Sequence, residues 1–105
     1  MTMQAIYDWI DANADECIKD LQTFVQQPSI SAQNIGLREC ATLIRDMMRR
    51  DGLPADFYEL DQGPPVVFGH LKAAKPAKTI LCYAHYDVQP PEPIEAWSHG
   101  GPWSA

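Results

Sequence analysis

The feature that most limits how this chain can fold is a short apolar run that ends in two polar residues. The run is Ile-Leu-Cys-Tyr-Ala at residues 80–84, and His85-Tyr86-Asp87 follows it directly. A run that is apolar at every position is typical of a strand covered on both faces, as in parallel sheets. Ligands in α/β proteins bind just beyond the carboxyl ends of such strands. The sequence therefore predicts a central strand with a functional site at its end.

His85 and Asp87 are the candidate functional residues at that site. Residues i and i+2 of an extended chain point to the same face, so the imidazole and the carboxylate should project together. A carboxylate that holds the second ring nitrogen is the usual companion of a metal-binding histidine. The pair therefore indicates a metal site, although a bare His-x-Asp is a weak signal because structural hydrogen bonding produces the same pattern.

The residues around the pair carry a much more specific signal. Residues 83–93 read Tyr-Ala-His-Tyr-Asp-Val-Gln-Pro-Pro-Glu-Pro, and Trp97 follows. This block closely resembles the first metal-site motif of the M20 zinc metallopeptidases, and it is most similar to the dipeptidase branch, which includes the carnosinase-like enzymes. The deacylase branch tends to have Val-Val-Pro after the Asp. One departure is Pro102-Trp103, where the family usually has Pro-Phe.

The resemblance implies roles for both candidate residues. His85 would ligate one of two zinc ions, and Asp87 would accept a hydrogen bond from the imidazole and fix its tautomer. The implied reaction is hydrolysis of the amide bond of dipeptides or short peptides by a metal-activated water. Manganese or cobalt could occupy the same ligands. The complete enzyme would be a homodimer.

The family's other zinc ligands and its general base are expected later than Ala105, and Glu92 and Glu95 are not assigned those roles. Residues 1–105 are therefore expected to be the N-terminal portion of a metallopeptidase catalytic domain. The rest of that domain and the lid or dimerisation domain would be absent, and the segment alone would be inactive. His70 has no acidic partner two residues away, and His99 lies in a loop, so neither is expected to bind metal.

Three alternatives stay open. The first is an aminoacylase or deacylase of the same family. The second is a truncated, non-catalytic protein that binds a partner through an incomplete sheet. The third is a generic α/β binding domain in which the His-x-Asp pattern is accidental.

The remaining elements follow from periodicity and turn signals. Apolar residues at helical spacing predict helices over residues 4–25 and from Leu37 to the turn at Gly52, with Asn34 as the N-cap of the second. Strands are expected over residues 56–60 and 66–71, with a connection at residues 73–78. The Pro-Ser-Ile-Ser segment at 28–31 is interpreted as a plain connection between helices. The predicted fold class is α/β, with two N-terminal helices packed on a mixed sheet and the motif strand central.

Composition narrows the partners and the compartment. The 105 residues include 8 Lys and Arg against 14 Asp and Glu, for a net charge of −6. This balance argues against nucleic acid or an anionic membrane as a partner, and no apolar run is long enough to cross a bilayer. The N-terminus does not have the pattern of a signal peptide. Cys17, Cys40 and Cys82 lack metal-type spacing and are interpreted as reduced core residues of a cytoplasmic protein.

Overall fold

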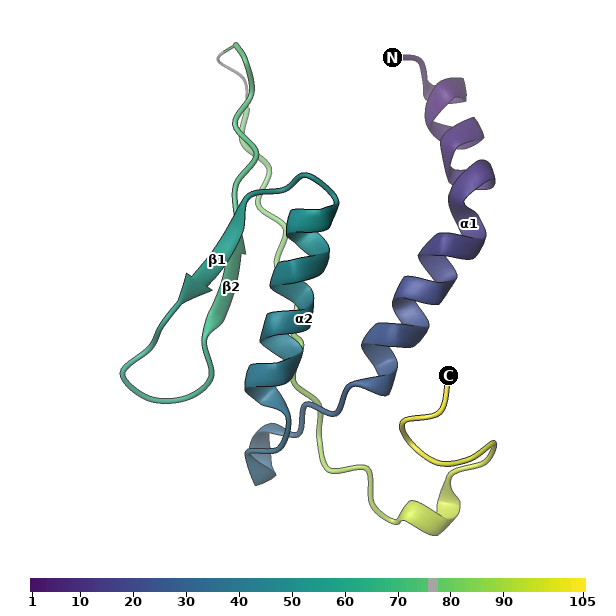
Figure 1. Cartoon of the computed structure of the whole chain (residues 1–105), viewed down its shortest axis with the longest axis vertical. Coiled ribbons are helices and arrows are strands. Elements are labelled where there is room, and N and C mark those ends of the chain that lie inside the picture. Colours follow the sequence, from purple (N-terminus) through teal and green to yellow (C-terminus); the bar gives the residue numbers. More distant parts are fainter. Residues whose placement is uncertain (76–77) are drawn as a thin grey trace.

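A computed structural model describes residues 1–75 and 78–105, so part of the predicted connection at 73–78 lies outside the described residues. Its elements, in chain order, are α1 (Met3–Gln26), the short 3-10 helix η1 (Ser31–Gln33), α2 (Leu37–Arg50), β1 (Ala55–Tyr58), β2 (Val66–Gly69) and the 3-10 helix η2 (Ile94–Ala96). In Figure 1, α2 lies between the β1–β2 hairpin and α1. The α/β class predicted from the sequence is confirmed.

α1 is the predicted first helix, and it begins and ends for local reasons. The Thr2 hydroxyl accepts a hydrogen bond from the Ala5 amide at 3.2 Å, which caps the N-terminus. Pro28 disfavours the helical conformation for Gln27, where the helix ends. No residue of α1 is buried, and most of its apolar stripe is exposed to solvent. None of the helices in the described part of the chain combines the length and the apolar character needed to cross a bilayer.

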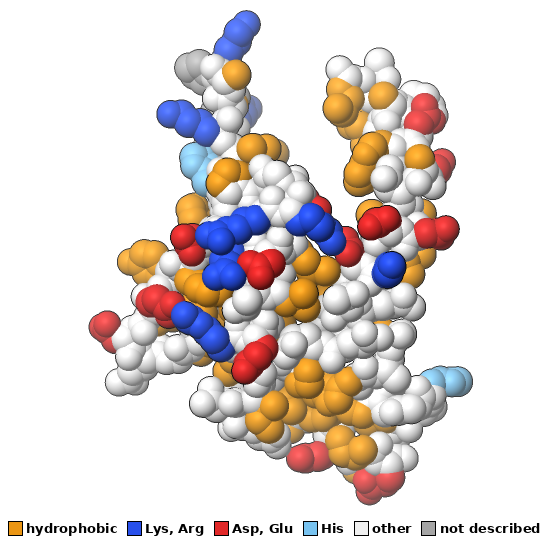
Figure 2. Space-filling model, in the orientation of Figure 1, with side chains coloured by type: hydrophobic (Ala, Val, Ile, Leu, Met, Phe, Trp, Pro, Cys, Tyr) orange, Lys and Arg blue, Asp and Glu red, His pale blue; other side chains and the backbone are white. Residues whose placement is uncertain are grey.

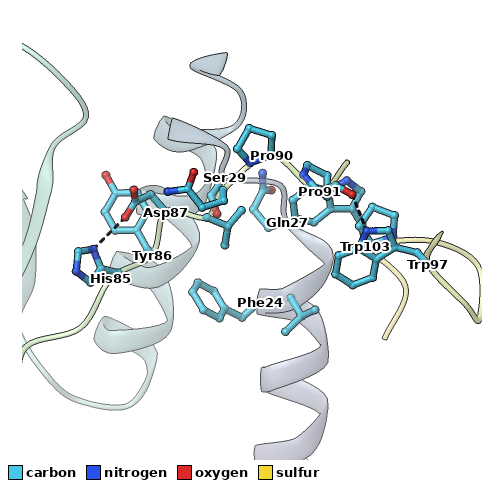
Figure 3. A pocket seen from close by; sticks show the side chains of 14 residues that line it. Phe24, Gln27, Ser29, His85, Tyr86, Asp87, Pro90, Pro91, Trp97 and Trp103 are labelled. Carbon is cyan, nitrogen blue, oxygen red and sulfur yellow. Dashed lines mark hydrogen bonds and ion pairs between the residues drawn. The ribbon is translucent and has the colours of Figure 1, made fainter. Parts of the chain in front are cut away.

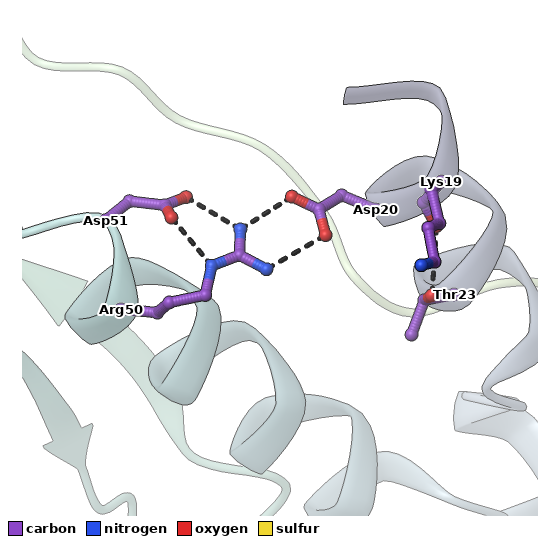
Figure 4. A network of polar contacts seen from close by, with 5 residues as sticks. All are labelled: Lys19, Asp20, Thr23, Arg50 and Asp51. Atoms are coloured by element: carbon purple, nitrogen blue, oxygen red, sulfur yellow. Dashed lines mark hydrogen bonds and ion pairs between the residues drawn. The ribbon is translucent and has the colours of Figure 1, made fainter. Parts of the chain in front are cut away.

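One ion-pair network joins α1 to α2 (Figure 4). The Arg50 guanidinium donates from Nη1 to Asp20 Oδ1 at 2.9 Å and also bonds the second oxygen of that carboxylate. Its Nε donates to Asp51 Oδ1 at 2.7 Å. The hydrogen bond from Arg50 lowers the pKa of Asp20. Because these side chains are partly exposed, the contact orients α1 more than it stabilises the fold.

The start of α2 differs from the prediction. Asn34 adopts the left-handed conformation at the end of η1, where its amide donates to the Ser31 carbonyl at 3.2 Å. The N-cap of α2 is Gly36, also left-handed with φ 68°. Asn34 was predicted as the N-cap because its side chain suits that role, but the same side chain also tolerates the left-handed region that closes a tight turn.

The end of α2 agrees with the prediction. Gly52 has φ 84°, its amide donates to the Arg49 carbonyl, and the Leu53 amide donates to the Met48 carbonyl at 2.9 Å. This pair of bonds is the Schellman motif, which satisfies carbonyls that the helix leaves free. Leu37, Cys40 and Ala41 of α2 are buried and form the centre of the small core.

The sheet is a two-stranded antiparallel hairpin. Ala55 pairs with Gly69 and Tyr58 with Val66, and alternate residues face α2, with Ala55 buried and Phe57 half-buried. At Gly69 the hairpin approaches α2 closely, because a Cβ there would lie 2.6 Å from Met48 Cε.

The sequence predicted a mixed sheet with the motif strand at its centre, and the structure differs on both points. Residues 80–84 run as extended chain outside any ladder of the described residues, and Ile80 and Leu81 are more than four-fifths exposed. A central strand needs a hydrogen-bonded partner on each edge, and within the described residues the one ladder joins β1 to β2. The apolar run therefore has the composition of a buried strand without the neighbours that bury it.

The same lack of covering elements explains why two of the three cysteines are exposed. All three are free thiols, as expected. Cys40 is buried in α2, but Cys17 and Cys82 are exposed, so the core assignment was wrong for those two. Cys17 lies on the uncovered helix α1, and Cys82 lies in the uncovered apolar run.

The surface over α2 carries interspersed charges of both signs (Figure 2). Arg38 pairs with Glu59 at 2.7 Å, and Arg49 pairs with Asp56 at 3.4 Å. The guanidinium groups of Arg38 and Arg45 each lie 4.6 Å from the centre of the Phe57 ring. Arg38, Arg45 and Arg49 therefore contact the hairpin, while Arg50 bonds Asp20 and Asp51, so the arginines of α2 do not form an open cationic patch.

Two left-handed glycines give the first prediction. A left-handed backbone costs a residue with a Cβ about 1–2 kcal/mol, so both Gly36→Ala and Gly52→Ala should destabilise the chain. A Cβ at Gly36 would also lie 2.1 Å from the Pro28 carbonyl oxygen, whereas a Cβ at Gly52 meets nothing within 4 Å. Gly36→Ala should therefore lower the free energy of unfolding, measured by urea denaturation, by about 1–3 kcal/mol more than Gly52→Ala. Equal losses for the two variants would contradict this packing.

Candidate functional site

The structure brings His85 and Asp87 together as predicted. His85 Nδ1 lies 3.1 Å from Asp87 Oδ1, and their side chains are 71% and 38% exposed. Figure 3 shows both residues at one end of a groove, with the imidazole turned toward the carboxylate. An ionised carboxylate only accepts hydrogen bonds, so this contact places the imidazole proton on Nδ1 and leaves a lone pair on Nε2.

The backbone around Asp87 is held by the Pro-Ser-Ile-Ser segment. The Val88 amide donates to the Ser29 carbonyl at 2.9 Å, and the Ser31 amide donates to the Val88 carbonyl at 3.4 Å. These bonds form an isolated parallel bridge between Ile30 and Val88. Ser29 is only 3% exposed and Ile30 is 5% exposed. The segment predicted to be a plain connection therefore fixes the position of the candidate site.

Ser31 also acts on the candidate site through its side chain. Interaction with its hydroxyl is the largest cause that lowers the pKa of Asp87, followed by the hydrogen bond to His85. Asp87 is therefore held in its ionised, hydrogen-bond-accepting form. The sequence signal that could have shown this is Ile30, an apolar residue between two serines, which suggests that the segment is anchored against the core.

Tyr86 anchors the motif from the opposite side. Its hydroxyl donates to the Pro65 carbonyl at 2.6 Å, next to the start of β2, and burial raises the pKa of its phenol. The buried Cys40 thiol of α2 lies 3.9 Å from the Tyr86 carbonyl oxygen, and burial likewise raises the pKa of this thiol. His85 and Asp87 therefore face the groove while the residue between them holds the segment to α2 and the hairpin.

A groove of about 450 Å³ adjoins the pair. In Figure 3 it extends from His85 past Phe24 of α1 to Trp97 and Trp103. The Trp97 indole donates to the Pro91 carbonyl at 2.6 Å, which fixes that wall. The groove thus has a polar end and a mainly apolar length, an arrangement that suits an organic ligand with an apolar part.

The two glutamates that follow Asp87 in the sequence, Glu92 and Glu95, do not join the pair. Glu92 accepts a hydrogen bond from Gln33 at 3.4 Å, and Glu95 lies in η2. Within residues 1–75 and 78–105, no three His, Cys, Asp or Glu side chains cluster closely enough to hold a metal ion. His85 with Asp87 therefore fits one metal-binding position, with the lone pair of Nε2 as the donor, but does not make a complete metal centre.

Comparisons with known proteins agree with the motif. No family model matches the sequence. The chain is 31% identical to the Cys-Gly metallodipeptidase dug1 of Schizosaccharomyces pombe, over 93% of this chain and 23% of that protein. It is 28% identical to the Cys-Gly metallodipeptidase DUG1 of Candida albicans, over 92% of this chain and 23% of that protein. The chain therefore spans less than a quarter of the length of these curated relatives.

A solved structure resembles the fold itself. The crystal structure of the M20 family metallo-carboxypeptidase Sso-CP2 from Sulfolobus solfataricus matches with a TM-score of 0.72 and 35% sequence identity. The match covers 78% of this chain and 18% of that chain. The arrangement of elements described above is therefore shared with part of a larger peptidase.

The electrostatics of Asp87 give the second prediction. Its carboxyl, followed by ¹³C NMR against pH, should titrate below the ordinary aspartate range, and Ser31→Ala should move that pKa upward because the hydroxyl that most lowers it is lost. The lowered folded-state pKa contributes stability above the unfolded-state pKa, and this contribution disappears as the pH falls through the folded-state value. Ser104→Ala removes a hydroxyl that bonds the His99 and Gly101 carbonyls, and it should leave Asp87 unchanged. An unshifted Asp87 in Ser31→Ala would contradict this account.

The anchoring by Tyr86 gives the third prediction. Tyr86→Phe should lower the free energy of unfolding by about 1–3 kcal/mol, because the carbonyl of the buried Pro65 loses its donor. The Val88 amide should also exchange with deuterium faster, since the motif is held less firmly. Tyr7→Phe alters an exposed tyrosine of α1 and should have little effect on either measurement. If the two variants behave alike, the hydroxyl of Tyr86 does not anchor the motif.

Proposed function

The chain belongs to the M20 family of metallopeptidases, and on that premise we propose that it forms part of a zinc-dependent peptidase that hydrolyses the amide bond of dipeptides or other short peptides. Both yeast relatives are named as metallodipeptidases, and the structural neighbour is a metallo-carboxypeptidase. These names support amide hydrolysis near a chain end. A dipeptidase is preferred because the block after Asp87 reads Val-Gln-Pro-Pro-Glu-Pro.

The observation that carries the proposal is the hydrogen bond between His85 Nδ1 and Asp87 Oδ1 at 3.1 Å. It leaves Nε2 of His85 as a donor for one zinc ion, and Asp87 keeps the proton on the other nitrogen and fixes the ring. A zinc ion held there would lower the pKa of its bound water and would polarise the scissile carbonyl. The chain's own contribution is therefore to orient one ligand and to hold its tautomer.

The remaining parts of such a centre are proposed to come from outside residues 1–105. A hydrolytic zinc needs about three protein ligands, and a general base must reach the attacking water. The described residues offer one imidazole and its carboxylate partner. The segment alone is therefore expected to bind zinc weakly and to show no peptidase activity.

The fourth prediction tests the role of each residue in the complete protein. His85→Ala should reduce the zinc content, measured by elemental analysis, and abolish hydrolysis of Cys-Gly and similar dipeptides. Asp87→Ala should lower metal affinity or activity about 10- to 100-fold, because it removes the partner that orients the ligand. His70→Ala is the matched control, since His70 is an exposed histidine outside the groove and should leave both readouts unchanged.

The same measurements separate the alternatives. Hydrolysis of N-acyl amino acids in place of dipeptides would favour an aminoacylase or deacylase. Unchanged zinc content and activity in His85→Ala would reduce the His-x-Asp pattern to a structural hydrogen bond. A native product that ends at residue 105 and lacks activity would favour a non-catalytic binding protein.

A further inference from the structure

Tyr83 lies beside His85 and Asp87, but the proposed function gives it no role. The Tyr83 hydroxyl oxygen lies 3.3 Å from Nε2 of His85. The two rings meet edge to face, with centroids 5.4 Å apart and planes at 68°. Tyr83, His85 and Asp87 are two residues apart in sequence, and the contacts between them place all three side chains on one face. They form a hydrogen-bonded row of phenol, imidazole and carboxylate.

The direction of the hydrogen bonds in this row follows from the charge of Asp87. The carboxylate can only accept, so Nδ1 of His85 carries the proton and Nε2 carries a lone pair. The phenol must then donate its O–H to Nε2. This is the same lone pair that a metal ion would take, because it is the only one left on the ring.

We propose that Tyr83 is a positioning residue that caps Nε2 of His85 in the metal-free protein and sets the plane of the imidazole through its ring edge. The inference rests on the metal-binding role proposed for His85. A metal ion that binds Nε2 must displace the phenol hydrogen bond, while the edge-to-face contact can persist. The hydroxyl therefore opposes metal binding, and the aromatic ring favours it.

The exposure of Tyr83 sets the expected size of the effect. The residue is 81% exposed, and its hydrogen bond is long at 3.3 Å. Such a bond competes with water and lies at the weak end of the usual range, so removing it should change metal affinity by about two- to threefold.

Two substitutions separate the hydroxyl from the ring. Tyr83→Phe keeps the ring edge against His85 and removes the O–H, whereas Tyr83→Leu removes both. Tyr58→Phe is the matched control, because Tyr58 is also exposed and lies on β1, away from the groove. All variants would be made in the full chain and labelled with ¹⁵N, and folding would be checked by the amide spectrum.

The first readout needs no metal. In mildly alkaline buffer, long-range ¹H–¹⁵N correlation resolves both ring nitrogens of His85. Tyr83→Phe should shift the Nε2 resonance toward that of a nitrogen without a hydrogen bond, while Nδ1 stays protonated. Tyr58→Phe should leave both resonances in place. An unchanged Nε2 resonance in Tyr83→Phe would overturn the proposed cap.

The second readout is titration with Zn²⁺, followed at the same two nitrogens. Tyr83→Phe should bind zinc about two- to threefold more tightly than the wild type, and Tyr83→Leu should bind less tightly than Tyr83→Phe. Equal affinities for the wild type and Tyr83→Phe would overturn the opposing role of the hydroxyl, and equal affinities for the Phe and Leu variants would overturn the orienting role of the ring. If zinc shifts the His85 resonances in no variant, the metal role of His85 fails, and the inference fails with it.

Discussion

The parallel bridge between Ile30 and Val88 is the interaction on which the candidate site depends. It joins two segments that are far apart in the sequence, and it does so through backbone hydrogen bonds beside the buried residues Ser29 and Ile30. Because Val88 follows Asp87 directly, this bridge fixes the position of the Asp87 backbone. Tyr86 then holds the segment from the other side. The exposed pair of His85 and Asp87 is thus supported by contacts to the buried residues Ser29, Ile30 and Pro65.

Local signals predicted the elements well wherever they depended on neighbours in sequence. The apolar stripe of α1 and the left-handed Gly52 at the end of α2 were both visible in the residue types. The N-cap of α2 was missed because Asn34 suits both a cap and a left-handed turn. The choice between those two roles depended on Gly36, which can approach the Pro28 carbonyl because it has no side chain.

The long-range arrangement was less accessible from the sequence. The apolar run at 80–84 has the composition of a buried central strand, but whether it forms one depends on partners that composition does not reveal. The juxtaposition of His85 and Asp87 was predictable because it follows from the two-residue repeat of extended chain. The support from Ser29 and Ser31 was not, since it requires knowing which loop packs beside the motif. The contact of Tyr83 with His85 follows the same two-residue spacing, but Tyr83 was interpreted only as part of the apolar run at 80–84.

The position of the tryptophans has an optical consequence. Of the 3 tryptophans in the chain, Trp97 and Trp103 line the groove, while Trp9 lies on α1. Indole emission depends on the polarity around the ring, and the Trp97 nitrogen is engaged by the Pro91 carbonyl. With Trp9 replaced, the tryptophan emission of the chain comes from the two groove residues alone. Occupancy of the space beside His85 can therefore be followed in solution without a dye.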